Sequence, residues 1–269
     1  MNLIDKFSRR FPDPYRYLRF RTEALRLGWG EWRSNLSDES LPVPPPVLRF
    51  RVHGSVEVGS YLEVGQNCAR DIKQMLNSVG KDFHAFTQIL DFGCGSGRVM
   101  RFLRDGPESC HLSGTDIDKH AIRWCRRHLG FASWSSNSAL PPTTYADQTF
   151  DFIYAISVFT HINEEMQFAW LRELKRITKP GGILILTVHG EFAADGFPAD
   201  TKALIAEQGF FYTIQQTGRF KLDGLPDFYQ ATYHSRAYIE DRWSKFFKII
   251  GYVERGLNGH QDAVILQNQ

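Results

Sequence analysis

The sequence predicts an α/β fold in which a mostly parallel sheet is covered by helices on both faces. Three observations lead to this prediction. Apolar, strand-like runs alternate with helix-like segments from residue 89 onward, and such alternation is typical of parallel sheets. A glycine-rich stretch, Gly93–Gly97, directly follows the first apolar run. A proline-rich segment, Leu41–Val47, separates this pattern from a basic N-terminal stretch.

The first 55 residues are expected to form a helical arm and a connector. Within Met1–Leu36, basic side chains outnumber acidic ones, and aromatic side chains are interleaved with them. Such a segment fits a helix packed on the core with solvated arginines. It also fits a surface that meets an anionic partner or makes weak contact with a membrane surface. Prolines at 42, 44, 45 and 46 predict a stiff, extended connector.

The first elements of the core are identified from apolar periodicity and from the residues that bound each run. Helices are expected where apolar side chains recur every three or four positions, and strands where short apolar runs end in glycine or an acidic residue. In chain order these are a helix at Val58–Val79, a strand at Ile89–Phe92, a helix at Arg98–Arg104, a strand at His111–Asp116, a helix at Lys119–His128 and strands at Phe131–Ser135 and Phe150–Ile156.

The remaining elements follow the same rhythm with one interruption. A helix is expected at Glu164–Thr178, because Asn163 is a suitable N-cap and Lys179-Pro180-Gly181-Gly182 would end it. Residues 191–234 are rich in Gly, Phe, Tyr and Gln and are interpreted as an insertion. The other expected elements are a strand at Ile183–Val188, a helix at Ser235–Phe246 and strands at Phe247–Glu254 and Ala263–Leu266. The expected units are therefore 1–55 and 56–269.

Composition narrows the classes of function. A formal net charge of +2 is too small to suggest a specific nucleic-acid binder. No apolar run reaches the length of a membrane span, and the N-terminus has no signal-peptide core. The four cysteines have neither metal-type nor disulfide-type spacing. No metal is therefore expected, and a cytoplasmic location with free thiols is the simplest account.

The glycine-rich stretch marks the expected ligand site, because glycine permits positive φ and lets a ligand approach the backbone. Its spacing is G-x-G-x-G, with Asp91 before it and Arg98 after it, and so differs from the dinucleotide fingerprint G-x-G-x-x-G. Asp116 ends the next strand, where a carboxylate can accept both hydroxyls of a ribose. The alternative role, capping the following helix, suits Asp118 better.

Four segments together resemble the class I S-adenosylmethionine-dependent methyltransferases: Asp91–Gly97, Leu112–Asp118, Phe150–His161 and Leu174–Thr187. They match, in order and spacing, the family's glycine motif, its ribose-binding acidic strand, and its fourth and fifth strands. The resemblance implies a Rossmann-like, seven-stranded sheet with a reversed last strand. It also implies S-adenosyl-L-methionine as cofactor and S-adenosyl-L-homocysteine as product.

The resemblance assigns expected roles at the cofactor site. The residues expected to bind the cofactor are Asp91, Gly93, Cys94, Gly95, Gly97, Arg98, Asp116, Ile117, Asn137, Ala155 and Ser157. Asn137 stands where many members carry an acidic residue that contacts the adenine amino group, so the chain departs from the family pattern there. Arg98, expected at a helix start where a cation opposes the helix dipole, is either a solvated residue or the partner of an anionic group.

Methyl transfer from a sulfonium depends mainly on in-line positioning, but a hydroxyl or protonated amine acceptor must also lose a proton. Histidine is the natural base near neutral pH. His161 and His189 follow the fourth and fifth strands and are the candidate bases, although a structural role remains open for each.

The leading hypothesis is methyl transfer to an oxygen of a small-molecule or glycan acceptor, with residues 191–234 as a lid that excludes water. The aromatic side chains of this insertion suit an acceptor pocket or the packing of the insertion itself. Motifs such as Thr187–Glu191 and Gln261-Asp262 also resemble a bacterial subgroup encoded with glycan and natural-product pathways. The alternatives are N-methylation of a small molecule, methylation of protein or nucleic acid, and cofactor binding with other chemistry.

Overall fold

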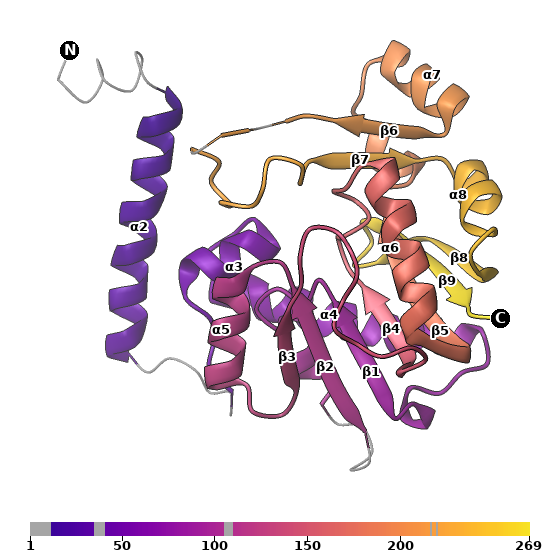
Figure 1. The fold of residues 1–269 in the computed structure, drawn as a ribbon. Coiled ribbons are helices and arrows are strands. Elements are labelled where there is room, and N and C mark those ends of the chain that lie inside the picture. The colour runs from indigo at the N-terminus through magenta and orange to yellow at the C-terminus, as the bar shows by residue number, and fades with distance from the viewer. Residues whose placement is uncertain (1–11, 35–40, 105–109, 216, 219) are drawn as a thin grey trace.

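The computed structural model describes residues 12–34, 41–104, 110–215, 217–218 and 220–269. Its centre is a seven-stranded sheet with the strand order β3-β2-β1-β4-β5-β9-β8 (Figure 1). Strands β1 to β5 are parallel, and β9 is antiparallel to both of its neighbours, β5 and β8. The predicted Rossmann-like sheet with one reversed strand is confirmed.

The strands follow the predicted apolar runs closely. They are β1 Gln88–Phe92, β2 His111–Asp116, β3 Ser133–Ser136, β4 Phe150–Ala155, β5 Thr178–Val188, β8 Lys248–Leu257 and β9 Gln261–Gln267. β5 begins at Thr178 rather than at Ile183, because Thr178 pairs with Phe150 of β4. The Pro-Gly-Gly sequence therefore lies inside the strand, where the amide of Gly181 donates to the Asn268 carbonyl at 2.8 Å.

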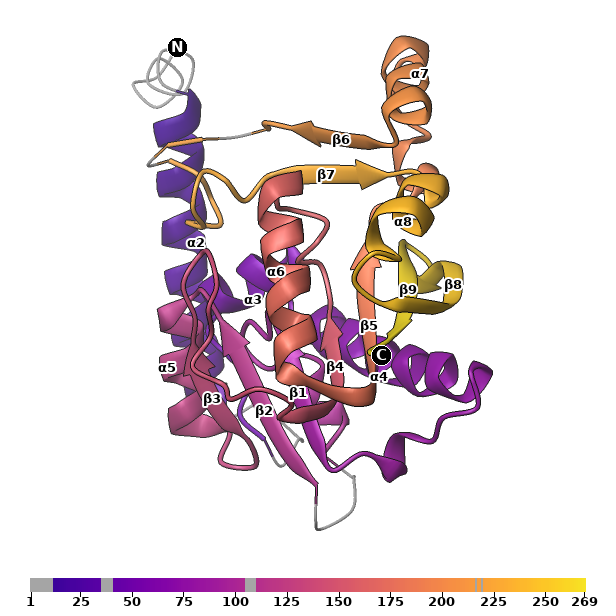
Figure 2. The same ribbon diagram turned by 45° about the vertical axis from the view of Figure 1, so that its right-hand side comes forward.

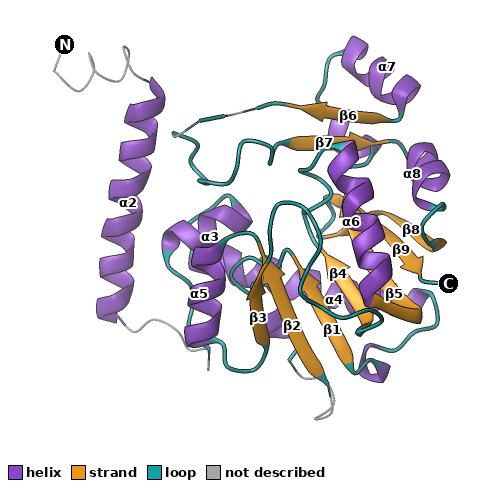
Figure 3. Ribbon diagram, in the orientation of Figure 1, coloured by secondary structure: helices purple, strands orange, loops and turns teal. Residues whose placement is uncertain are grey.

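Helices cover both faces of the sheet (Figures 2 and 3). The main helices of the chain are α2 Pro12–Ser34, α3 Pro46–His53, α4 Val58–Ser78, α5 Lys119–His128, α6 Glu164–Ile177 and α8 Arg236–Trp243, of which α4, α5, α6 and α8 pack on the sheet. Alternate side chains of β1 separate two buried layers. Ile89 packs with residues of α4 and α5, and Leu90 packs with residues of α6 and α8. This alternation is the two-sided burial expected of a parallel sheet.

The predicted helix starts at Asp118 and Asn163 are confirmed. The Asp118 carboxylate accepts from the amides of His120 and Ala121 at the start of α5. The Asn163 side chain accepts from the Met166 amide at 2.9 Å at the start of α6. Each side chain satisfies amides that lack a partner inside the helix.

The predicted helix at Arg98–Arg104 is wrong. Turns and a short 3-10 helix at Met100–Phe102 occupy this segment. Arg101 is buried and donates to the carbonyls of Leu41 and Pro42 at 3.1 and 2.8 Å. Helix α4 also crosses so closely that a Cβ at Gly65 would lie 2.4 Å from the Arg98 carbonyl oxygen. These tertiary contacts outweigh the local helical propensity.

The connector is extended only up to Pro45, because Pro46 begins the unpredicted helix α3. Proline is well suited to the first turn of a helix, where its missing amide is not needed. The buried Arg49 then anchors α3 through bonds to the carbonyls of Val56 and Pro44, both at 2.6 Å. The segment after the connector is thereby held close to the carboxyl ends of the strands.

Helix α2 lies beyond the β3 edge of the sheet in both views (Figures 1 and 2). Its Phe20 ring packs on Phe50 of α3 with a centroid separation of 4.4 Å, and Tyr17 packs on Phe220 of the insertion at 6.0 Å. Its arginines at 16, 19, 21 and 26 are exposed, as expected for a packed arm with solvated arginines. The arm's remaining basic and aromatic side chains, before residue 12 and at 29–33, lie outside the description.

The insertion has a fold of its own. It contains a 3-10 helix at Glu191–Ala194, helix α7 Ala199–Gln208, and the antiparallel pair β6 Phe210–Thr213 and β7 Ala231–His234. β7 is bound to the loops after β4 and β5, because Thr232 and His234 donate to the carbonyls of Thr160 and His189, both at 2.8 Å. The insertion therefore lies over the carboxyl ends of the parallel strands (Figure 1).

Within the described residues, no helix combines the length and apolar character needed to cross a bilayer.

Candidate functional site

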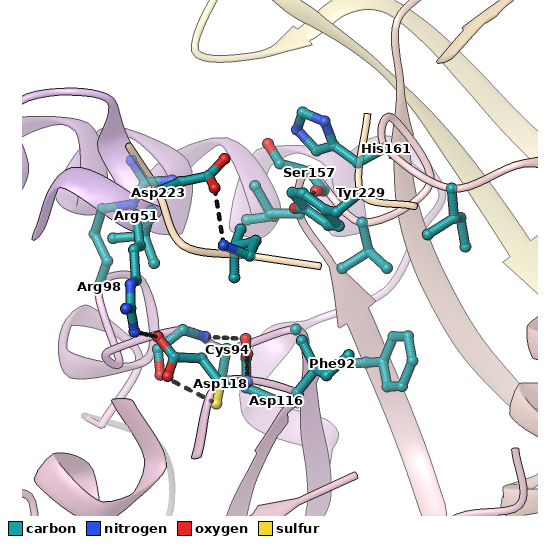
Figure 4. A pocket seen from close by; sticks show the side chains of 18 of the residues that line it. Arg51, Phe92, Cys94, Arg98, Asp116, Asp118, Ser157, His161, Asp223 and Tyr229 are labelled. Atoms are coloured by element: carbon teal, nitrogen blue, oxygen red, sulfur yellow. Dashed lines mark hydrogen bonds and ion pairs between the residues drawn. The ribbon is translucent and has the colours of Figure 1, made fainter. Parts of the chain in front are cut away.

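A cavity of about 660 Å³ opens at the carboxyl ends of the strands, beside the glycine-rich loop. One of its walls is formed by this loop and the end of β2, and the facing wall by the loop after β4 and the insertion (Figure 4). Helix α3 contributes the segment from Phe50 to Gly54. The strand order reverses between β1 and β4, which is where ligands bind in open α/β sheets.

The glycines of the loop are required by its shape. Gly93, Gly95 and Gly97 have φ values of +80°, +53° and +75°, which other residues adopt at a cost. A Cβ at Gly93 would lie 2.2 Å from Val158, and one at Gly95 would lie 2.2 Å from Val52. Gly93 and Gly95 line the cavity, whereas Gly97 packs beside Leu129 and is not part of the lining.

Asp116 lies where the ribose-binding carboxylate is expected. Its two oxygens accept from the amides of Gly95 and Asp118, both at 2.7 Å. Each carboxylate oxygen retains a second lone pair, so hydroxyl groups can still be bound. Burial raises the pKa of Asp116 to about 6. Its neighbour Ile117 also lines the cavity.

Asn137 lines the same end of the cavity, but its side chain already has partners within the chain. Its Oδ1 accepts from the Thr115 hydroxyl at 3.0 Å, and its Nδ2 donates to the Ser138 carbonyl at 2.8 Å. Asn137 thus lines the cavity, and these two bonds fix the orientation of its amide.

Asp91 is buried beneath the loop, and the Tyr154 hydroxyl donates to its Oδ2 at 3.0 Å. Burial, reinforced by the nearby charge of Asp116, raises the pKa of Asp91 to about 8. A cationic group entering the cavity would favour the ionised form. Cys94 beside it is also buried, and burial raises the pKa of its thiol, which is therefore neutral.

Arg98 lines the cavity from a turn, not from the first turn of a helix. The helix-dipole argument for an anionic partner therefore does not apply. Its guanidinium lies 3.3 Å from Nδ1 of His53 and makes no ion pair with a carboxylate of the described residues. By contrast, Arg51 is paired with Asp118 at 2.6 Å. Arg98 is thus available to an anionic group in the cavity.

Ser157 follows β4 and is held in a left-handed conformation with φ of +58°. Its amide donates to the Thr187 hydroxyl at 2.9 Å, and its hydroxyl accepts from Nε2 of Gln261 at 2.6 Å. Its carbonyl accepts from the Tyr229 hydroxyl at 2.7 Å. Ser157 lines the cavity, whereas Ala155 is fully buried within the sheet and does not.

The two candidate bases occupy different positions. His161 lines the cavity, and its Nδ1 is hydrogen-bonded to the carbonyl of Gln230. Because a carbonyl only accepts, Nδ1 carries the proton and Nε2 has a free lone pair. Burial lowers the pKa of His161 to about 4, so the ring is neutral.

His189 lies behind His161, with a centroid separation of 5.9 Å, and is not part of the cavity lining. Its Nδ1 donates to the carbonyl of Thr232 in β7 at 3.1 Å. Burial, together with the neighbouring His161, lowers its pKa to about 4. These contacts make His189 a support for the insertion.

The insertion contributes residues that the sequence did not single out, notably Lys221 and Gln230. Phe228 and Tyr229 also line the cavity, whereas Phe197, Phe211 and Tyr233 form a small core within the insertion. The aromatic side chains of the insertion are thus divided between the lining of the cavity and the packing of the insertion itself. The described residues contain no cluster of three metal-ligating side chains.

Comparisons with known proteins agree with this geometry. Residues 89–182 match the family model of a methyltransferase domain. The malonyl-[acyl-carrier protein] O-methyltransferase of Enterobacter lignolyticus (strain SCF1) is 28% identical over 113 residues, which cover 42% of this chain and 42% of that protein. The match thus spans less than half of the length of that relative.

Two solved structures share the fold at low sequence identity. A protein of Pyrococcus horikoshii OT3 has a TM-score of 0.52 at 16% identity, covering 82% of this chain and 98% of that chain. A S-adenosylmethionine-dependent methyltransferase from Clostridium acetobutylicum ATCC 824 has a TM-score of 0.50 at 12% identity, covering 75% and 90%. Residues 89–182 thus match the model of a methyltransferase domain and lie within a Rossmann-like fold.

Proposed function

We propose that this chain transfers the methyl group of S-adenosyl-L-methionine to an oxygen of a small-molecule or glycan acceptor. One observation carries the proposal. A single cavity has the glycine loop and Asp116 on one wall, and a neutral histidine with a free Nε2, His161, on the facing wall. The name of the Enterobacter relative, an O-methyltransferase, supports oxygen as the accepting atom.

The residues of the cofactor end fit S-adenosyl-L-methionine. The free lone pairs of Asp116 suit the two ribose hydroxyls, and the backbone of Gly93 and Gly95 leaves room for close approach. Asp91 suits the cationic part of the methionine moiety, and Arg98 suits its carboxylate. When bound, the cofactor supplies a methyl group already activated for attack by a nucleophile.

His161 then acts on the acceptor. Its Nε2 takes the proton of the acceptor hydroxyl as the oxygen forms a bond to the methyl carbon. S-adenosyl-L-homocysteine would be the leaving group, and its sulfur would keep the bonding electron pair. One positive charge thus passes from the sulfur to the imidazole, and the net charge of the cavity is conserved. This conservation offsets the penalty that burial places on a charged His161.

The insertion serves as the lid of this reaction. Lys221, Phe228 and Tyr229 line the cavity, and Tyr229 lies on the side opposite the glycine loop (Figure 4). A covered cavity excludes water, which would compete with the acceptor for His161 and weaken every polar contact.

We include in this proposal the division into an arm and connector, 1–55, and a catalytic unit, 56–269. We also include membership of the bacterial small-molecule subgroup.

The acceptor can be identified by a methyl-transfer screen that uses labelled S-adenosyl-L-methionine and metabolites of the pathway encoded beside this gene. The variant His161→Gln then tests the base. We expect kcat to fall by about 10²- to 10⁴-fold, the usual contribution of a general base. Cofactor affinity should stay within about threefold of the wild-type value, because His161 makes no contact with Asp116 or the glycine loop. His111→Gln is the matched control, since His111 is exposed at the opposite end of β2. Full activity of His161→Gln would remove His161 from the mechanism.

A further inference from the structure

We propose that Tyr229 is a positioning residue that fixes the imidazole of His161 relative to the backbone of Ser157 in the loop after β4. Its ring holds the imidazole of His161, and its hydroxyl holds the backbone of Ser157. The inference rests on the proposed function, because it assigns His161 as the base. It goes beyond it by assigning the lid a part in aligning base and cofactor, in addition to excluding water.

The first half of the arrangement concerns His161. The rings of Tyr229 and His161 are stacked, with centroids 4.3 Å apart and planes inclined by 26°. The next residue, Gln230, binds His161 twice, since its amide donates to the His161 carbonyl at 2.9 Å and its carbonyl accepts from Nδ1. Two consecutive residues of the lid thus fix the plane of the imidazole and its tautomer.

The second half concerns Ser157 at the end of β4. The Tyr229 hydroxyl donates to the Ser157 carbonyl at 2.7 Å. Burial raises the pKa of Tyr229, so the hydroxyl keeps its proton and remains a donor. A left-handed, non-glycine residue such as Ser157 persists only where its surroundings hold it. Tyr229 shares this task with Thr187 and Gln261.

Tyr229 is itself held firmly. Its amide donates to the Pro226 carbonyl at 3.0 Å, and its carbonyl accepts from Nζ of the buried Lys221 at 2.7 Å. The same ammonium lies 5.8 Å from the centroid of the Tyr229 ring. A side chain anchored at its backbone, ring and hydroxyl can transmit the position of the lid to both His161 and Ser157.

The site requires this alignment because in-line transfer depends steeply on geometry. A displacement of about 1 Å can cost a hundredfold in rate. The base lies in the loop after β4, and the accepting atom must lie between that base and the cofactor. A connection that runs from Ser157, a residue predicted to bind the cofactor, through one aromatic ring to His161 sets this spacing without relying on the acceptor.

The test uses the full-length protein loaded with S-adenosyl-L-homocysteine, and so needs no acceptor. Nitrogen-15 NMR reports the tautomer and the titration of His161, and amide hydrogen exchange reports Ser157. Tyr229→Leu should raise the pKa of His161 from about 4 toward 6.5 and mix its tautomers, because the stacked ring is lost. It should also accelerate exchange of the Ser157 amide by about tenfold or more.

Tyr229→Phe separates the two contacts. This variant keeps the ring, so His161 should titrate as in the wild type, while the Ser157 amide should still exchange faster. Tyr212→Phe is the matched control, since its hydroxyl donates to the Phe228 carbonyl at 2.7 Å in the same insertion. It should alter neither readout.

Two results would overturn the proposal. One is an unchanged His161 titration and tautomer in Tyr229→Leu, in protein that still binds S-adenosyl-L-homocysteine. The other is unchanged Ser157 exchange in Tyr229→Phe. Full methyl-transfer activity of His161→Gln would instead refute the proposed base while leaving these NMR outcomes standing, so the two failures are distinguishable.

Discussion

Stability and cofactor binding make conflicting demands on Asp91, because burial disfavours the ionised carboxylate that is proposed to bind the cofactor. Its pKa is raised from 3.8 to about 8, chiefly by burial. At neutral pH the folded protein therefore holds a proton that the unfolded chain has already released. A raised carboxyl pKa costs no stability below about pH 4, and the cost grows as the pH rises toward 8. At pH 7 the cost is on the order of 4 kcal/mol.

Replacement of Asp91 tests this conflict. Asp91→Asn should raise the melting temperature of the cofactor-free protein at pH 7.5 by several degrees, because the amide needs no proton and can still accept from the Tyr154 hydroxyl. The gain should shrink as the pH is lowered to 4, while cofactor affinity should fall. Thermal denaturation across this range is the measurement, with Asp195→Asn as an exposed control. Equal melting temperatures of Asp91→Asn and the wild type at every pH would show that burial of the Asp91 carboxyl group does not destabilise the folded protein.

At the scale of elements, the contact between α3 and the glycine loop shapes the cofactor site. Gly95→Ala would place a Cβ 2.2 Å from Cγ1 of Val52, at a residue whose φ is +53°. We expect cofactor affinity to fall by about tenfold or more, because the loop must move away from its present shape. Calorimetry measures the loss.

Two companion variants sharpen that experiment. Val52→Ala, combined with Gly95→Ala, should restore part of the affinity by relieving the clash, although the backbone strain remains. Gly59→Ala is the control, because a Cβ there would meet no atom within 4 Å. An affinity loss equal in Gly59→Ala and Gly95→Ala would argue against a special role for the loop.

The glycine loop and the segment that follows it show which structural features can be predicted from the sequence. The glycine loop could be identified because its constraint is local: a buried strand, positive φ values and an acidic residue at the next strand end lie within about one supersecondary unit. The prediction of a helix at Arg98–Arg104 is wrong because residues distant in the sequence determine the conformation of this segment. The carbonyls of Leu41 and Pro42 bind Arg101, and Gly65 of α4 approaches the Arg98 backbone.

At the scale of the whole molecule, the two ends of the cavity differ in how far the sequence predicts them. Most residues expected at the cofactor end line the cavity, and the exceptions, Gly97 and Ala155, serve packing beside it. The other end depends on contacts between residues far apart in the chain, such as those of Tyr229 with Ser157 and His161. Apolar periodicity carries no information about such contacts, so the different positions of His161 and His189 could be recognised only from the fold.

The measurement that tests the central claim most directly is calorimetric titration of S-adenosyl-L-methionine into the wild-type protein and Asp116→Asn. Because the pKa of Asp116 is about 6, its ionised fraction rises about tenfold between pH 5 and pH 7. We predict binding at a single site that tightens by at least about tenfold over this interval, since ionisation of Asp91, whose pKa is about 8, acts in the same direction. Asp116→Asn should bind weakly at both pH values. Absence of binding by the wild type, or unchanged affinity of Asp116→Asn, would contradict the assignment of this cavity as the cofactor site.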